Sequence, residues 1–141
     1  MEAAADLQTV VIFENDPRQA EAYRQLFTDH GYVAERALPS DDVQALCGRV
    51  KPGVVVFDMA FWEADTAYVF GVLNNAVGFE RPLIVALSTL PVQSRRAKRF
   101  GADAVWVRGI DDAAQLPRLA GDLLRARQEG KLKPRQPTTP L

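Results

Sequence analysis

Polar side chains able to do chemistry stand directly after the short apolar runs of this sequence. They are carboxylates, an amide, hydroxyls and one cation, at Glu14, Asn15, Asp16, Asp58, Ser88, Thr89 and Arg108. Such a set suits phosphoryl transfer, because the Asp58 carboxylate can attack phosphorus and form an acyl phosphate. Neighbouring acids can hold Mg²⁺, and a hydroxyl and a cation can bind the remaining phosphoryl oxygens. We therefore expect any chemistry of this chain to centre on Asp58.

Three of the apolar runs predict strands that are buried on both faces. Thr9–Phe13, Gly53–Phe57 and Leu83–Leu87 do not alternate with polar residues, a pattern typical of a parallel sheet. Tyr32–Arg36 and Ala104–Val107 are weaker strands with the same spacing along the chain. In open α/β sheets, ligands bind outside the carboxyl ends of the strands. The polar groups that follow these strands are therefore expected to meet on one rim.

Helical patterns fill the intervals between these strands. Asp16 and Pro17 predict the start of the first helix, and Thr89 is expected to cap the fourth. Pro117 requires the last helix to start near Gln115 or with an irregular first turn. The other helices are expected over the segments 40–50, 69–76, 91–99 and 111–123. The alternation of strand and helix predicts a doubly wound α/β fold with right-handed crossovers.

The length and composition fit one domain with a tail. The domain is expected over residues 1–127, and the basic, proline-rich segment 128–141 is predicted to be disordered. The net charge is −1, so no general attraction to nucleic acid or to a membrane is expected. The first residues lack the pattern of a secretory signal, and Cys47 is the one cysteine. A reducing, cytoplasmic setting is therefore the expectation.

Other classes of ligand lack their motifs here. The sequence contains neither G-x-G-x-x-G after its first strand nor G-x-x-x-x-G-K-[ST], which argues against dinucleotide and P-loop nucleotide sites. His30 is the only histidine, which argues against histidine-based metal sites and Ser-His-Asp catalysis.

Five segments in this order and spacing carry a resemblance to a known family. They are residues 10–17, 31–33, 52–58, 83–88 and 101–108, and the match extends from Thr9 to Arg127. In these segments the chain resembles the receiver domain of bacterial response regulators, the phosphorelay proteins of two-component signalling.

The resemblance implies a fold and a set of functional residues. The fold would be the flavodoxin-like (βα)5 receiver fold, a five-stranded parallel sheet with strand order 2-1-3-4-5. Asp58 would be the phosphoacceptor, and a histidine kinase would be the phosphate donor. Mg²⁺ would be held by Glu14, Asn15, Asp58 and the backbone carbonyl of Ala60. Ser88 would be the switch hydroxyl that moves toward the phosphoryl group.

The sequence departs from the receiver pattern in three respects. Receivers usually have an acid where Asn15 stands, so Mg²⁺ should bind more weakly here. They usually have lysine and then proline where Arg108 and Gly109 stand. The planar guanidinium of Arg108 can fork onto Asp58 and occupy the place of the metal. Val105 stands where many receivers carry a switching aromatic residue.

These departures leave two functional hypotheses open. In the first, the chain is a signalling receiver switched by Mg²⁺-dependent phosphorylation at Asp58. In the second, it is a degenerate, atypical receiver that acts as a protein-interaction module without phosphorylation. A hydrolytic enzyme with Asp58 as nucleophile is a remote third reading, because the sequence offers no obvious base to activate water. We therefore expect no enzyme activity beyond self-phosphorylation and dephosphorylation at Asp58.

The fourth predicted helix is the basic element of the chain. Its cations are Arg95, Arg96, Lys98 and Arg99, and acids follow nearby at Asp103, Asp111 and Asp112. The simplest interpretation of these cations is that they form the solvent-exposed face of the helix. In receivers, this helix and the strand and helix that follow it form the face that contacts partners. Opposite charges on one face can be self-complementary, so the expected partners are a histidine kinase or other signalling protein and a second copy of this chain.

Overall fold

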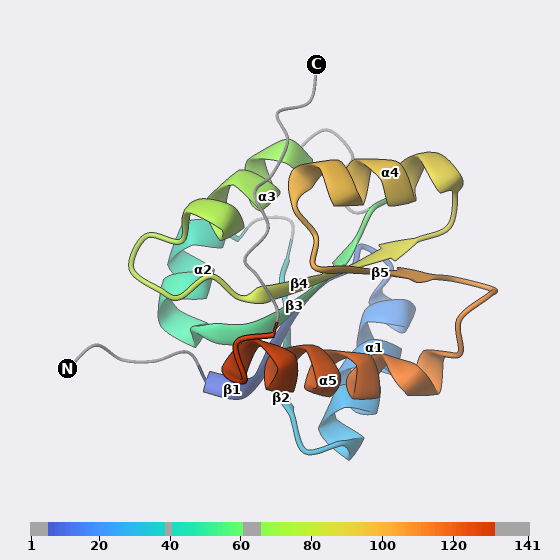
Figure 1. Ribbon diagram of the computed structural model, residues 1–141, viewed down its shortest axis with the longest axis horizontal. Helices are drawn as coiled ribbons and strands as arrows, with labels where there is room; N and C mark the ends of the chain where they lie inside the picture. The colour runs from blue at the N-terminus through green and yellow to red at the C-terminus, as the bar shows by residue number, and fades with distance from the viewer. Residues whose placement is uncertain (1–5, 39–40, 61–65, 132–141) are drawn as a thin grey trace.

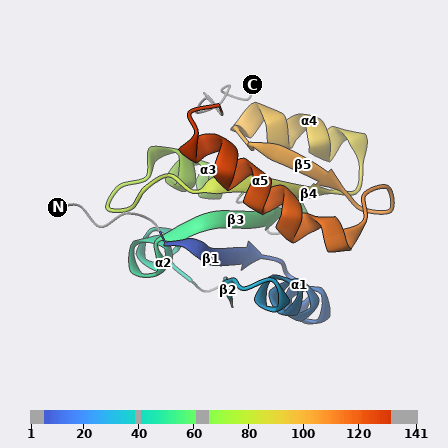
Figure 2. The same cartoon turned by 60° about the horizontal axis from the view of Figure 1, so that its bottom comes forward.

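Successive residues of the central strands point to opposite sides of a sheet, and both sides are buried. The computed structural model describes residues 6–38, 41–60 and 66–131. Its strands are β1 (Asp6–Phe13), β2 (Val33–Arg36), β3 (Pro52–Asp58), β4 (Leu83–Ser88) and β5 (Ala104–Val107). All pairings are parallel, and the order is β2-β1-β3-β4-β5. Figure 2 shows the strands in this order. The predicted fold class and strand order are confirmed.

Two layers of helices cover the sheet (Figure 1). The helices are α1 (Pro17–Asp29), α2 (Val43–Val50), α3 (Thr66–Asn75), α4 (Pro91–Phe100) and α5 (Leu116–Gln128), with the short 3-10 helix η2 (Ala113–Gln115) before α5. One apolar cluster lies between the sheet and α2, α3 and α4, and a second lies between the sheet and α1 and α5. Among the described residues, no helix combines the length and the apolar character that crossing a membrane requires.

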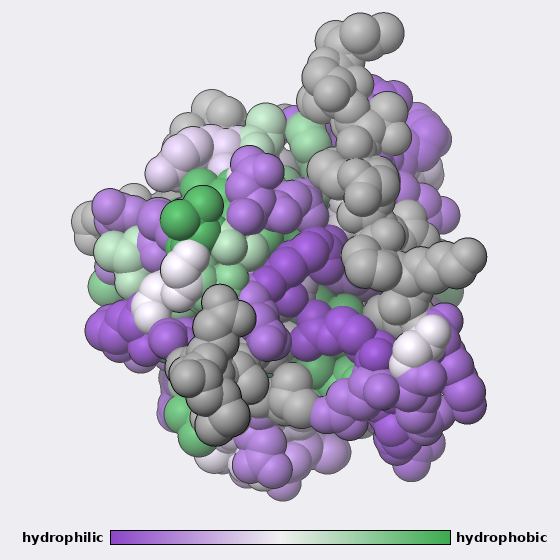
Figure 3. All heavy atoms as spheres, turned by 60° about the vertical axis from the view of Figure 1, so that its left-hand side comes forward, coloured by the Kyte–Doolittle hydropathy of each residue, from purple (hydrophilic) through white to green (hydrophobic). Residues whose placement is uncertain are grey.

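The apolar side chains of β1, β3 and β4 fill both clusters. Phe57 of β3 is fully buried, and its ring lies 5.5 Å from that of Phe13 and 5.1 Å from that of Phe70. The face of the molecule in Figure 3 is correspondingly hydrophilic over most of its described area, with apolar side chains showing only in small areas. Burial of the central strands therefore supplies most of the apolar driving force for this fold.

Helix starts agree with the sequence at two positions and differ at a third. Asp16 caps α1, since its carboxylate accepts from the backbone N–H of Arg18 at 2.9 Å. The irregular start at Pro117 is also observed, because η2 precedes α5. The prediction that Thr89 caps α4 was wrong. The cap residue is Leu90, and the side chain of Gln93 accepts hydrogen bonds from the backbone N–H groups of Thr89 and Leu90 instead.

The predicted division of the chain stays a prediction. The last helix ends at Gln128, which is close to the expected boundary at residue 127. Residues 132–141, most of the predicted tail, lie outside the described residues.

A buried ion pair fixes the amino ends of β4 and β5. Arg81 Nη1 lies 3.0 Å from Asp103 Oδ2, and the Arg81 side chain also donates to the carbonyl of Gly101 at 2.8 Å and the side chain of Asn74 at 2.9 Å. The same Asp103 oxygen accepts from the backbone N–H of Ile84 at 2.8 Å. One carboxylate therefore satisfies a buried cation and a buried strand N–H together.

Replacing Asp103 by alanine should destabilise the protein strongly. The change leaves a buried guanidinium without its partner and a strand N–H without an acceptor, at a cost of about 3 kcal/mol in the free energy of unfolding. Urea denaturation followed by circular dichroism measures this cost. Asp122→Ala is the matched control, because Asp122 pairs with Arg125 on the exposed face of α5 and should cost less than about 0.5 kcal/mol. Equal effects of the two substitutions would contradict the prediction.

Candidate functional site

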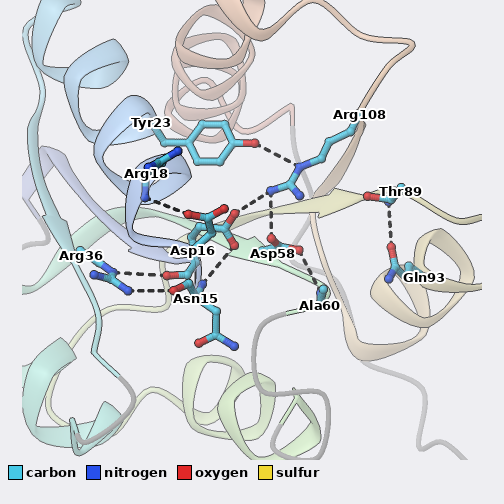
Figure 4. Close-up of polar contacts among 11 residues, drawn as sticks. Asn15, Asp16, Arg18, Tyr23, Arg36, Asp58, Ala60, Thr89, Gln93 and Arg108 are labelled. Atoms are coloured by element: carbon cyan, nitrogen blue, oxygen red, sulfur yellow. Dashed lines mark hydrogen bonds and ion pairs between the residues drawn. The ribbon is translucent and has the colours of Figure 1, made fainter.

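The carboxyl ends of β1, β3 and β5 bring three ionisable side chains together. Glu14 follows β1, Asp58 ends β3, and Arg108 follows β5. β1 and β3 are direct neighbours in register, with Phe13 opposite Phe57, so Glu14 and Asp58 lie side by side on the rim. The rim predicted from the strand order is therefore present, and Figure 4 shows its polar contacts.

One nitrogen of Arg108 bridges both carboxylates. Its Nη2 lies 2.9 Å from Asp58 Oδ2 and 3.0 Å from Glu14 Oε1. Glu14 and Asp58 are only 3% and 5% exposed, and the Arg108 side chain is 23% exposed. Charges this far from water interact more strongly than surface ion pairs do. The guanidinium is therefore the counter-cation of this acidic site.

Burial and mutual repulsion set the protonation of the site. Burial raises the pKa of Glu14, the hydrogen bond to Asp58 and its charge raise it as well, and Arg108 lowers it, which together bring it to about 8. Burial lowers the pKa of Arg108, but the attraction of Asp58 and Glu14 outweighs it, and the net direction is upward. At neutral pH a pKa of about 8 favours the protonated form of Glu14.

Backbone groups hold the remaining oxygens of the two acids. Asp58 Oδ1 accepts from the N–H of Ala60 at 2.9 Å, and Glu14 Oε2 accepts from the N–H of Asn15 at 3.1 Å. Arg36 of β2 donates to the carbonyls of Glu14 and Asn15, at 3.3 and 3.0 Å. These contacts fix the loop after β1 against the rim.

Two of the predicted site residues, Asn15 and Ser88, have their side chains directed to other partners or to solvent. The amide of Asn15 is exposed and points away from Asp58 in Figure 4. The hydroxyl of Ser88 donates to the carbonyl of Leu90 at 3.0 Å and pairs with the Ser94 hydroxyl of α4 at 2.7 Å. Asp16 caps α1 and takes no part in the site. The structure thus joins Glu14, Asp58 and Arg108, and it places the other polar groups around them.

The residues as arranged do not fit a divalent metal ion. Magnesium takes an octahedron of oxygen ligands, usually water molecules together with one or two carboxylates whose oxygens are free to bind it. Glu14 and Asp58 are already bridged by a guanidinium, and no group of three or more acidic, histidine or cysteine side chains suited to a metal occurs in the described part of the chain. The positive charge beside these two acids is therefore supplied by the Arg108 guanidinium.

Tyr23 of α1 is a member of the site that the sequence did not single out. Its hydroxyl accepts a hydrogen bond from Arg108 Nε at 3.1 Å, and the guanidinium carbon lies 5.7 Å from the ring centroid. In the sequence, Tyr23 follows Ala20 by three residues and precedes Phe27 by four, a spacing that predicts one buried helix face. Its hydroxyl was the feature of the sequence that could have indicated a polar contact, because a buried tyrosine hydroxyl usually has a hydrogen-bond partner.

Comparison with known proteins gives matches at the level of structure. No protein-family model and no curated protein sequence matches this chain. A response-regulator receiver domain from Bermanella marisrubri superposes with a TM-score of 0.71 at 21% identity, covering 83% of this chain and 98% of that one. The receiver domain of a sensor histidine kinase from Pseudomonas aeruginosa, solved with a magnesium ion in its active-site cleft, gives 0.71 at 15% identity over 84% and 98%.

A third match is a response regulator from Burkholderia pseudomallei that carries a phosphorylated aspartic acid and a calcium ion. Its TM-score is 0.65 at 15% identity, covering 87% of this chain and 74% of that one. Identities this low establish the architecture and leave the chemistry open. The chain has the five-stranded α/β fold of response-regulator receiver domains.

Proposed function

We propose that this chain is a signal-transduction receiver module in which Arg108 replaces the metal ion of the acidic site. One observation carries the proposal: Arg108 Nη2 lies 2.9 Å from Asp58 Oδ2 and 3.0 Å from Glu14 Oε1. In receivers, the corresponding acids hold Mg²⁺. Here the guanidinium uses the oxygens that a metal would need, so the module acts through protein contacts and without Mg²⁺-dependent phosphorylation.

Two costs oppose metal binding at this site. A divalent ion must displace Arg108 from its contacts with both acids in a site that is largely shielded from water. It must also bind where Glu14, with its pKa raised to about 8, holds a proton at neutral pH, although metal ligands are deprotonated groups. Both costs favour the arginine-bridged state.

The second candidate function is phosphorylation at Asp58 by a histidine kinase. It is favoured by the place of Asp58 at the end of the middle strand, with Oδ1 held by the N–H of Ala60 and Glu14 alongside. In this reaction Asp58 would attack the phosphorus of a phosphohistidine, and the bond from phosphorus to the histidine nitrogen would break. Arg108 would first have to leave the acids, and a metal ion would have to enter.

A second copy of this chain, or another signalling protein, would contact the surface of α4, β5 and α5. Arg95, Lys98 and Arg99 are exposed on α4. A cavity of about 320 Å³ beside β5 is lined in part by Val105, Asp111 and Asp112. Cations and acids on one surface support a self-complementary contact.

The purified protein should not be phosphorylated by acetyl phosphate. With millimolar Mg²⁺ or without it, intact mass spectrometry should show no added phosphoryl group, and beryllofluoride should leave the tryptophan fluorescence unchanged. The reason is that Arg108 blocks the metal that this reaction needs. A Mg²⁺-dependent mass increase that disappears in Asp58→Ala would establish the second candidate instead.

Removal of the Arg108 side chain should convert the site into one that binds metal. In Arg108→Ala, Asp58 loses its ionic partner, so without Mg²⁺ the free energy of unfolding should fall by about 3 kcal/mol. Added Mg²⁺ should restore part of this loss. Titration calorimetry with MgCl₂ should show at least about tenfold tighter binding than in the wild type.

Arg49→Ala is the control for this substitution. Arg49 forms an exposed ion pair with Glu35, so replacing Arg49 should change neither the Mg²⁺ affinity nor the free energy of unfolding appreciably. If the wild type binds Mg²⁺ as tightly as Arg108→Ala does, the guanidinium does not compete with the metal and the proposed function is wrong.

A further inference from the structure

Tyr23 contacts the guanidinium of Arg108 with both its hydroxyl and its ring. The hydroxyl accepts from Nε at 3.1 Å, and the ring centroid lies 5.7 Å from the guanidinium carbon. Tyr23 is itself 8% exposed and belongs to the apolar cluster under α1 and α5. In Figure 4, Tyr23 and Asp58 approach Arg108 from different sides. The guanidinium is therefore held between an aromatic group and two acids.

The hydroxyl of Tyr23 supplies a second point of attachment. Both acids contact the same nitrogen, Nη2, and contacts at one atom leave the guanidinium plane free to turn. A hydrogen bond at Nε fixes that plane, because the donors of an arginine have a rigid arrangement. With Tyr23 in place, Nη2 is aimed at the gap between the two carboxylates.

The distance that Arg108 must span explains why it needs such support. Neighbouring strands lie about 4.8 Å apart, and β4 separates β5 from β3. From the end of β5, Arg108 has to cross about 10 Å to the line of β3 and about 14 Å to that of β1. A long side chain held only at its tip would lose much rotamer freedom. Tyr23, from α1, contacts the Arg108 side chain at Nε and so supports it short of its tip.

We propose that Tyr23 is a positioning residue that keeps Arg108 in the bridge between Glu14 and Asp58 and thereby excludes divalent cations. This inference rests on the proposed function, since it gives Tyr23 its role through Arg108. Tyr23 also lies on α1, so the bond couples α1 to the segment between β5 and α5.

The test is the Mg²⁺ affinity of matched variants, measured by titration calorimetry with MgCl₂. Tyr23→Phe keeps the ring and removes only the hydroxyl that accepts from Arg108. Tyr32→Phe is the control, because Tyr32 is another partly buried tyrosine, packed edge-on against Phe27 and outside the site. Arg108→Ala and the double variant Tyr23→Phe with Arg108→Ala complete the set, and thermal denaturation checks that each variant is folded.

Tyr23→Phe should bind Mg²⁺ about fivefold more tightly than the wild type, the change expected for one lost hydrogen bond. Tyr32→Phe should match the wild type, and the double variant should match Arg108→Ala. If Arg108→Ala gains affinity and Tyr23→Phe does not, the role of Tyr23 is wrong while the proposed function stands. If the double variant binds Mg²⁺ more tightly than Arg108→Ala, Tyr23 does not act through Arg108 and its proposed role is also wrong. If Arg108→Ala does not gain Mg²⁺ affinity, both the role of Tyr23 and the proposed function are wrong.

Discussion

The bridge from Arg108 to two buried carboxylates is the interaction on which the rest of the site depends. Two acids side by side at the end of a sheet repel each other, and burial makes their charged forms costly. One guanidinium nitrogen at 2.9 and 3.0 Å offsets both effects. The raised pKa of Glu14 has the same origin, because burial and the neighbouring Asp58 both raise it while Arg108 lowers it.

The fold makes this bridge possible by holding the strand ends in place. β1 and β3 pair in register and set Glu14 beside Asp58, while the backbone N–H of Arg108 donates to the carbonyl of Ser88 at 2.9 Å and fixes where its side chain starts. At the opposite end of the sheet, the Arg81–Asp103 pair ties β4 to β5. A buried ion pair at each end therefore controls how β5 sits against the rest of the sheet.

The fold was predictable from the sequence because buried parallel strands leave a strong apolar signal. The convergence of Glu14, Asp58 and Arg108 followed from the same pattern, since all three stand directly after strands. The side-chain directions did not follow. Ser88 and Asn15 lie at their predicted places in the fold. The Ser88 hydroxyl, however, bonds the Ser94 hydroxyl, and the Asn15 side chain is exposed to solvent. The sequence also could not show that Gln93 would replace Thr89 in capping α4, or that Tyr23 would reach Arg108.

The most direct measurement of the central claim is nitrogen-15 nuclear magnetic resonance of the arginine side chains. In the arginine-bridged site, the Nε–H of Arg108 is bonded to Tyr23 and shielded from water. Its signal should therefore be sharp and slow to exchange at neutral pH, and it should stay unchanged when millimolar Mg²⁺ is added. A saturable shift or loss of that signal with Mg²⁺ would show that the metal displaces Arg108 and would contradict the account.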